Sequence, residues 1–228
     1  MLDLGCDRTK LIVNYLGISL RALVQLKRED ANCIKLICVA ALREEKGHVY
    51  LIKALEKVKQ RYQNIRLYLV GDGELKAKLV RLVRELDLED CVEFLGWKTE
   101  DEVFEWLAMV DIYVQHSIRY KSEKDWKEEG LPMSLVEAAS MGLPLVATDI
   151  GGTPEVCFHG YNGLLSEEKD ILSMAENIIR LIENPDSRLQ FGQMGRKVIS
   201  EKFDSSRVLP QLENIYQSLI NRFNQVKK

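Results

Sequence analysis

The sequence predicts an α/β fold in which a doubly wound parallel sheet is covered by helices on both faces. The first observation is that short β-branched runs alternate with longer segments of helical period, as in successive βαβ units. The second is a composition of 46% hydrophobic and 29% charged residues over 228 positions, which suits one large domain with a core. The third is that strand-like runs stop at residue 167, after which the chain is helical. We therefore expect a single Rossmann-like domain over residues 1–228 with C-terminal helices.

The expected elements follow in chain order. Apolar stripes predict core helices at residues 47–62 and 73–86. The segment from residue 167 reads as consecutive helices that Pro185 and Pro210 separate. Six runs rich in β-branched and apolar residues predict the strands: 11–15, 34–40, 65–71, 92–96, 111–117 and 145–150.

Charge and cysteine content exclude several classes of protein. With 32 basic and 35 acidic residues, the net charge of −3 leaves no excess to hold a nucleic-acid backbone, so we expect no nucleic-acid partner. Five scattered cysteines are odd in number and indicate reduced thiols in a cytoplasmic protein. The N-terminal segment fits neither a signal peptide nor a spanning helix.

The stretch "EGLPMSLVE" at residues 129–137 carries the strongest site signal. Pro132 suits the first helical position, so the amides of Met133 and Ser134 would face an anion at the carboxyl edge of the sheet. Glu129 would stay in the loop and Glu137 along the helix, so the two carboxylates flank this anion seat. Carboxylates accept hydrogen bonds from diols, which suits a nucleoside diphosphate bearing a sugar. A solvated acidic loop followed by a helix-surface salt bridge is the alternative.

The longer run "EGLPMSLVEAASMGLPLVATDIGGTPEV" resembles the donor-site signature of the retaining glycosyltransferases of family 4 (group 1), which have the GT-B fold of two facing Rossmann-like domains. Further matches occur in the order of that family: "AALREEKG", "LYLVGDGEL", "VEFLGW" and "DIYVQHS". The resemblance implies that the chain is the C-terminal, donor-binding half, with residues 1–30 as the interdomain segment and first strand and 167–228 as the helical C-terminal part. It also implies transfer of a sugar from a nucleotide sugar with retention of configuration.

The resemblance implies a role for each matching residue. Glu137 would hold the ribose hydroxyls of the donor, and Glu129 would lie beside the transferred sugar. Arg43 and Lys46 would meet the diphosphate, where fixed cations stabilise the charge that develops on the leaving group. Glu129, Arg43 and Lys46 are therefore the expected catalytic residues. The other expected donor-binding residues are Gly130, Leu131, Pro132, Met133, Ser134, Gly73, Gly96 and Trp97.

The same sequence predicts neither a metal nor another cofactor. It contains no D-x-D pair, and its three histidines are not spaced as metal ligands. The expected partners are a UDP- or GDP-sugar donor and a missing N-terminal acceptor domain. The resemblance places such a protein in the cytoplasm or at the inner face of the membrane, in peripheral contact through the acceptor domain.

Two classes of function stay open. One is a glycosyltransferase of hexosyltransferase type that is inactive without its N-terminal half, and the other is a non-catalytic nucleotide-sugar-binding subunit of a split transferase. A nucleotide-sugar epimerase is a distant third. An oxidoreductase is disfavoured because Lys76 occupies the third glycine position of the dinucleotide fingerprint.

Overall fold

The computed structural model describes residues 5–21, 33–121 and 126–226. The chain divides into two compact units, one formed by Arg21–Lys197 and the other by Met1–Leu20 with Val198–Lys228. The larger unit contains the sheet and every candidate site residue. A single domain over residues 1–228 stays a prediction.

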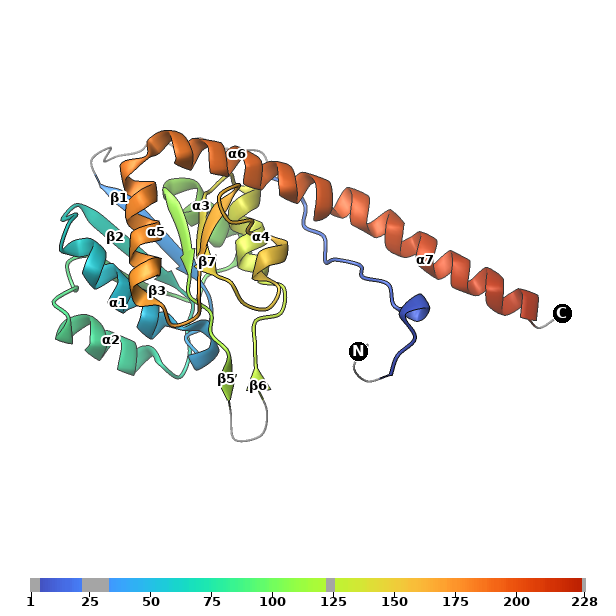
Figure 1. The fold of residues 1–228 in the computed structure, drawn as a ribbon, viewed down its shortest axis with the longest axis horizontal. Coiled ribbons are helices and arrows are strands. Elements are labelled where there is room, and N and C mark those ends of the chain that lie inside the picture. The colour runs from blue at the N-terminus through green and yellow to red at the C-terminus, as the bar shows by residue number, and fades with distance from the viewer. Residues whose placement is uncertain (1–4, 22–32, 122–125, 227–228) are drawn as a thin grey trace. The chain divides into compact units, whose positions relative to one another are not determined.

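The larger unit is built on a six-stranded sheet in the order β3-β2-β1-β4-β7-β8, and all neighbouring strands pair in parallel (Figure 1). The order places β1 and β4 side by side in the centre, so the chain reverses its direction of winding between them. This confirms the predicted doubly wound α/β class. The strands are β1 Ile34–Val39, β2 Ile65–Val70, β3 Val92–Gly96, β4 Ile112–Gln115, β7 Leu145–Thr148 and β8 Gly163–Ser166.

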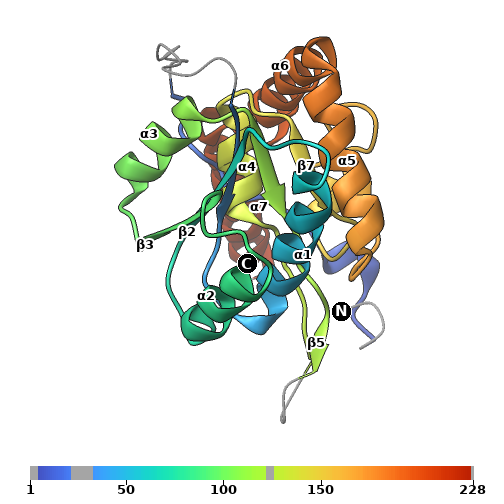
Figure 2. The same cartoon turned by 90° about the vertical axis from the view of Figure 1, so that its left-hand side faces the viewer.

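Helices cover both faces of the sheet (Figures 1 and 2). One face carries α1 (His48–Lys59), α2 (Lys76–Glu85) and α5 (Ile171–Glu183), with α1 packed between the other two. The other face carries α3 (Glu100–Met109), which contacts β1, and α4 (Met133–Ser140), which contacts β7. Because successive helices change face after β3, the loops that follow β1 and β4 lie at the point where ligands bind in such folds.

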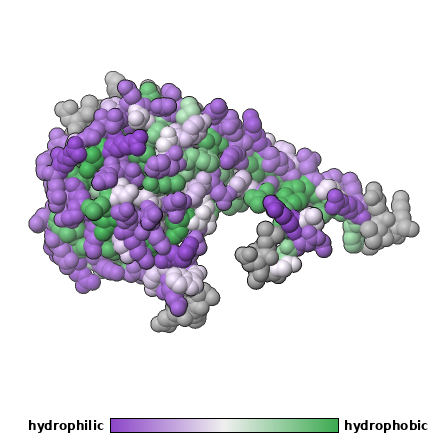
Figure 3. All heavy atoms as spheres, viewed as in Figure 1, coloured by the Kyte–Doolittle hydropathy of each residue, from purple (hydrophilic) through white to green (hydrophobic). Residues whose placement is uncertain are grey.

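The core confirms the apolar stripes that the sequence predicts for the first two helices. Leu51, Ile52, Leu55 and Val58 of α1 are all buried, and so are Leu79 and Val83 of α2. They pack on strand residues such as Leu36, Leu67 and Val146, none of which is exposed. Burial of such side chains stabilises the fold by about 1.5–3 kcal/mol each. Polar residues cover most of the face seen in Figure 3.

One predicted strand is wrong and three were missed. Residues 11–15 do not form a strand, and Ile12 and Val13 are 63% and 79% exposed. The only pairing described near them is an isolated bridge between Ile18 and Asp204 in the smaller unit. The missed elements are very short: β8 has four residues, and the β5–β6 hairpin joins Tyr120–Lys121 to Trp126–Lys127. The two hairpin strands have two residues each, and β8 contains no β-branched or aromatic residue, so none of the three gives a strand signal.

The helical C-terminal part is confirmed except at one proline. Pro185 begins α6 (Pro185–Lys202), but Pro210 lies inside α7 (Ser205–Val226) and does not separate two helices. The break falls instead at Asp204, whose carboxylate accepts a hydrogen bond from the Ser206 amide at 2.9 Å. No helix within the described residues is long and apolar enough to cross a membrane. The described part of the chain also contains three short 3-10 helices, which are η2 Arg8–Lys10, η3 Glu44–Lys46 and η4 Thr153–Glu155.

Candidate functional site

The predicted site residues lie on loops at the carboxyl edge of the sheet. Arg43 and Lys46 follow β1, Gly73 follows β2, and Gly96 ends β3. Residues from Glu129 to Pro132 lie between the β5–β6 hairpin and α4, and Met133 and Ser134 are the first residues of α4. The fold therefore brings to one edge residues that are separated by as many as 91 positions, from Arg43 to Ser134.

The Glu129 carboxylate has several hydrogen-bond partners at this edge. Its side chain is 9% exposed and forms an ion pair with Lys46, whose Nζ lies 2.8 Å from Oε1 and 2.6 Å from Oε2. Oε2 also accepts hydrogen bonds from Gln115 Nε2 at 3.1 Å and from Ser117 Oγ at 2.9 Å. Three donors thus hold Oε2, whereas Oε1 contacts Lys46 and keeps capacity to accept another hydrogen bond.

The two cations of the predicted site differ in their surroundings. Lys46 ends η3, and its side chain is 23% exposed, so a ligand on the surface can still reach its ammonium group. Arg43 is exposed at the start of η3 and forms no ion pair with any acid in the described parts of the chain. The structure therefore brings Lys46, but not Arg43, into contact with Glu129.

Helix α4 begins one residue later than predicted. Pro132 is its N-cap, because a ψ of 99° is extended and does not belong to a helix. Met133 and Ser134 are the first two helical residues, so their amides have no partner within the helix. The Leu135 amide donates to the Pro132 carbonyl at 3.0 Å. The amides at this helix end are therefore free of partners within the helix, and their contact with an anion stays a prediction.

Glu137 lies in the second turn of α4 and is partly buried. The pKa of its carboxyl group is raised to about 7, chiefly by burial and also by the nearby Glu100 carboxylate, while Arg21 acts in the opposite direction. Arg21 is itself held by ion pairs to Glu100 at 3.1 Å and Asp101 at 2.8 Å. Glu137 and Glu129 have different neighbours, in agreement with the prediction that the two carboxylates do not meet.

The loop after β7 holds the backbone beside Glu129. The Gly152 amide donates to the Gly130 carbonyl at 3.0 Å. Gly151 has a φ of +54°, and a Cβ there would lie 1.8 Å from the carbonyl oxygen of Glu129. Only glycine allows this approach. The sequence reasoning did not assign these glycines to the site, although both lie within the run that carries the resemblance.

Replacing Gly151 with alanine should displace the Glu129 backbone and lower the free energy of unfolding by about 2–3 kcal/mol, because it adds a clash to an unfavourable φ. Gly160 is a matched control, since it has a φ of +75° and a Cβ there would meet nothing within 4 Å. Gly160→Ala should cost about 1 kcal/mol, from the backbone alone. Urea denaturation measures both, and equal losses would contradict the clash.

Gly73, Gly96 and Trp97 play different structural parts. A Cβ on Gly73 would lie 2.6 Å from the Leu42 carbonyl oxygen, which also accepts the Leu75 amide at 3.1 Å. Gly73 therefore allows the loops after β1 and β2 to pack together. Gly96 has a φ of +72° with open space around it, and Trp97 is 72% exposed. Their contact with a nucleoside stays a prediction.

Two histidines flank the site but are neutral. His48 and His116 are 1% and 0% exposed, and burial lowers the pKa of each to about 4. The His116 Nε2 accepts a hydrogen bond from the Lys169 amide at 2.9 Å. Cys38, whose Sγ lies 3.9 Å from His48 Nε2, is also buried, and its pKa rises to about 12. At neutral pH these groups carry no charge.

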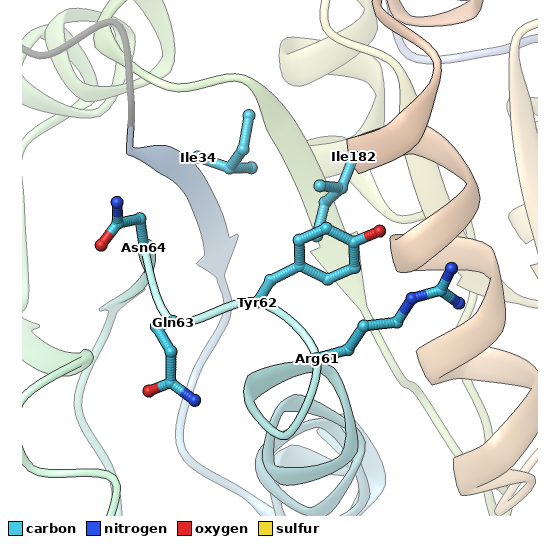
Figure 4. Close-up of a pocket in the computed structure, with 6 residues that line it drawn as sticks. All are labelled: Ile34, Arg61, Tyr62, Gln63, Asn64 and Ile182. Carbon is cyan, nitrogen blue, oxygen red and sulfur yellow. The ribbon is translucent and has the colours of Figure 1, made fainter.

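Two further observations bear on ligands. In the described ranges, no group of three or more His, Cys, Asp or Glu side chains is arranged to hold a metal ion. A hollow of about 350 Å³ lies at the opposite, amino edge of the sheet, where α1 ends and β1 begins (Figure 4). Two of its polar side chains, Arg61 and Tyr62, already have a partner, because both contact Glu183. The hollow is lined by Ile34, Arg61, Tyr62, Gln63, Asn64 and Ile182.

The fold and the site define one half of a two-domain GT-B protein. The chain superimposes on HepE of Anabaena in complex with UDP-glucose with a TM-score of 0.82 and 25% identity, covering 95% of this chain and 60% of HepE. It also matches the C-terminal domain of the group 1 glycosyl transferase LpcC from Francisella tularensis, with a TM-score of 0.71 and 20% identity. That match covers 83% of this chain and 100% of the LpcC domain, so the chain is the C-terminal half of the fold.

The chain belongs to the family described as glycosyl transferases group 1, whose model matches residues 24–198. Among curated relatives, it is 30% identical to the amylovoran biosynthesis glycosyltransferase AmsK of Erwinia amylovora, over 96% of this chain and 53% of AmsK. It is 32% identical to the N-acetyl-alpha-D-glucosaminyl L-malate synthase of Bacillus anthracis, over 88% of this chain and 50% of the synthase. The chain thus spans about half the length of these relatives.

Proposed function

We propose that this chain is the donor-binding half of a glycosyltransferase that transfers a sugar from a UDP- or GDP-sugar with retention of configuration. The observation that carries the proposal is the Lys46–Glu129 ion pair in front of the α4 N-terminus. The pair joins a cation to a carboxylate at the carboxyl edge of the sheet, and Glu129 precedes the first of the two helix-end amides by four residues. That combination suits a diphosphate joined to a sugar.

The proposed roles follow from charge and position. Lys46, Arg43 and the α4 N-terminus stabilise the charge that grows on the leaving diphosphate as the bond to the sugar breaks. Glu129 accepts a hydrogen bond from the transferred sugar through Oε1, since its other oxygen is already occupied. Glu137 accepts hydrogen bonds from the ribose hydroxyls. Gly130 to Ser134, Gly73, Gly96 and Trp97 line the donor.

The relatives support this class of substrate. HepE of Anabaena was crystallised with UDP and with UDP-glucose, and AmsK is named for the biosynthesis of amylovoran. We infer a hexosyltransferase of polysaccharide biosynthesis that acts in the cytoplasm, with its acceptor held by an N-terminal domain that reaches the inner face of the membrane. Fractionation of cells that express the chain with that domain tests this location.

A ligand screen tests the proposal directly. A ligand that binds the folded state raises the melting temperature, so UDP, GDP or ADP and their sugars should raise it more at equal concentration the more tightly they bind. No shift with any of them would contradict donor binding. We expect the isolated chain to transfer little sugar, because the domain that orients the acceptor supplies much of the rate. Transfer restored by adding the N-terminal half separates an enzyme from a non-catalytic binding subunit.

Donor binding should not require a metal ion, because Lys46, Arg43 and a helix N-terminus meet the diphosphate. The dissociation constant for UDP should therefore agree within about twofold in EDTA and in Mg²⁺, which corresponds to about 0.4 kcal/mol. Calorimetry in the two buffers makes the comparison. A tenfold loss of affinity in EDTA that Mg²⁺ or Mn²⁺ restores would contradict the prediction.

A further inference from the structure

Strand β4 ends in a glutamine whose amide lies inside the candidate site. Gln115 has a polar side chain but is only 1% exposed, and the residues before it in the strand are apolar or aromatic. Its Oε1 accepts hydrogen bonds from Tyr113 Oη at 2.8 Å and Ser134 Oγ at 3.1 Å. Its Nε2 donates to Ser117 Oγ at 2.9 Å and to Glu129 Oε2 at 3.1 Å.

This network fixes the orientation of the Gln115 amide. A side-chain amide has two donor hydrogens and two acceptor lone pairs, and all four are used here. Burial of an amide costs free energy unless it is hydrogen-bonded, so the amide cannot turn without leaving polar groups unpaired. The NH₂ group therefore faces Glu129, and the carbonyl oxygen faces the first turn of α4.

The amide thus joins the two parts of the donor site. On one side it holds Ser134, whose backbone amide is one of the two α4 N-terminal amides that are proposed to meet the diphosphate. On the other side it holds the Oε2 atom of Glu129, directly and through Ser117. Fixing Oε2 aims Oε1 at the position proposed for the transferred sugar. A catalytic or binding group needs such support to stay in its productive geometry.

We propose that Gln115 is a positioning residue that determines how strongly the site prefers a sugar nucleotide to the bare nucleoside diphosphate. The inference rests on the proposed function, because it presumes that the sugar meets Glu129. Gln115 itself is buried and touches no ligand. It acts by holding Glu129 at a fixed distance from the α4 N-terminal amides.

The first test is Gln115→Met, which keeps the length of the side chain and removes its hydrogen bonds. Calorimetry with UDP and UDP-glucose should show that the preference for UDP-glucose falls roughly five- to tenfold, the effect of one ordinary hydrogen bond. The affinity for UDP should change by less than about twofold. A purely structural role would lower both affinities together or neither.

The control is Asn162→Ala. Asn162 is also a fully buried amide, and it bonds the backbone of Val156 and Phe158 at 2.8 and 2.7 Å, away from Glu129. The substitution should lower the melting temperature but leave the ratio of the two affinities unchanged. An altered ratio in this control, or an unaltered ratio in Gln115→Met, overturns the inference.

A second variant, Gln115→Glu, keeps the shape and guards against misfolding of the first. As a carboxylate it would repel Glu129, whereas as a protonated acid it would donate to Glu129 as the native amide does. Its preference for UDP-glucose should therefore be weak at about pH 8 and recover towards about pH 5.5. The titratable groups in contact with residue 115 are Glu129 and Tyr113, with Lys46 paired to Glu129 and with Cys38 and Glu137 near Tyr113. The preference measured for the variant is therefore divided by that of the native chain at the same pH.

The outcomes distinguish this inference from the proposed function. If the native chain binds UDP-glucose more tightly than UDP but Gln115→Glu shows the native ratio at both pH values, the positioning role fails and donor binding stands. If the native chain binds neither ligand, both fail. If the native chain binds the two ligands equally, Gln115 sets no preference and the inference is overturned.

Discussion

Lys46→Met should lower the free energy of unfolding by about 3 kcal/mol, because it leaves the Glu129 carboxylate buried without its cation. Glu129 is 9% exposed, so water can replace little of the lost interaction. The same change should weaken UDP binding roughly 10- to 100-fold and leave uridine binding unchanged, since uridine has no phosphate to meet an ammonium group. Urea denaturation and calorimetry measure the two effects.

A double variant separates stability from binding. Glu129→Gln added to Lys46→Met removes the buried charge, so it should restore about 2 kcal/mol of stability without restoring the affinity for UDP. Glu129→Gln alone should increase the affinity for UDP several-fold, because Lys46 is then no longer neutralised by the carboxylate, and should decrease the preference for UDP-glucose. A gain in the affinity for UDP together with a loss of the preference for UDP-glucose is expected only if Lys46 interacts with both the carboxylate and the diphosphate.

Lys78→Met is the matched control. Lys78 forms an ion pair with Glu44 at 3.0 Å, but the two side chains are 52% and 32% exposed. Such a surface pair contributes about 0–1 kcal/mol, so its loss should change neither stability nor UDP binding appreciably. An equal effect of Lys46→Met and Lys78→Met would show that burial of the Glu129 pair has no consequence.

The fold was predictable because its signals are local. Runs such as 34–40 and 65–71 are continuous and apolar, as in strands buried on both faces, and the stripes of α1 and α2 repeat at helical period. The strand β8 was not predicted because Gly163–Ser166 contains no β-branched or aromatic residue, and its pairing with β7 cannot be seen in the local sequence. The run at 11–15 was wrongly predicted as a strand because its β-branched residues favour extended backbone, and this propensity does not form a strand unless another strand pairs with it.

The site was predictable as a set of loops but not as a set of contacts. The local sequence "EGLPMSLVE" is enough to indicate a helix N-terminus with one acidic residue before it and another within the helix. That Glu129 pairs with Lys46, 83 positions earlier, depends on the strand order. Gln115 gave one local signal, a polar residue at the end of an apolar run, and its role appears only when the partners from α4 and the Glu129 loop converge on it.

Glu137→Gln should make the protein more stable at about pH 8, by about 2 kcal/mol after allowance for solvent screening. The pKa of Glu137 is raised from 4.5 to about 7, chiefly by burial. Between these values the folded state binds more protons than the unfolded state, so the native free energy of unfolding falls as pH rises through this window. The neutral amide has no such penalty. The variant and the native chain should therefore have similar stabilities below about pH 4.5 and diverge up to about pH 7.

Urea denaturation across this pH range measures the divergence, and the difference between native and variant removes the titration of all other groups. Glu85→Gln is the control, because it makes the same substitution at a residue that is exposed on α2. Glu100→Gln removes a charge that raises the pKa of Glu137, so in its background the divergence caused by Glu137→Gln should be smaller. A flat curve for Glu137→Gln would contradict the raised pKa.

Ligand binding should depend on the same proton. Ribose hydroxyls that donate to Glu137 favour its ionised form, so uridine should bind more tightly as pH rises from about 6 to about 8 and should displace a proton near neutrality. Uridine is the probe because it has no phosphate that titrates in this range. Calorimetry in buffers of different ionisation enthalpy counts the proton released.

Glu137→Gln should abolish this pH dependence and weaken uridine binding roughly 10- to 150-fold, the loss of hydrogen bonds to a charged group. A variant that gains stability while it loses the nucleoside would show that the fold tolerates a costly buried carboxylate because the ribose needs it, whereas pH-independent uridine binding by the native chain would remove Glu137 from the donor site.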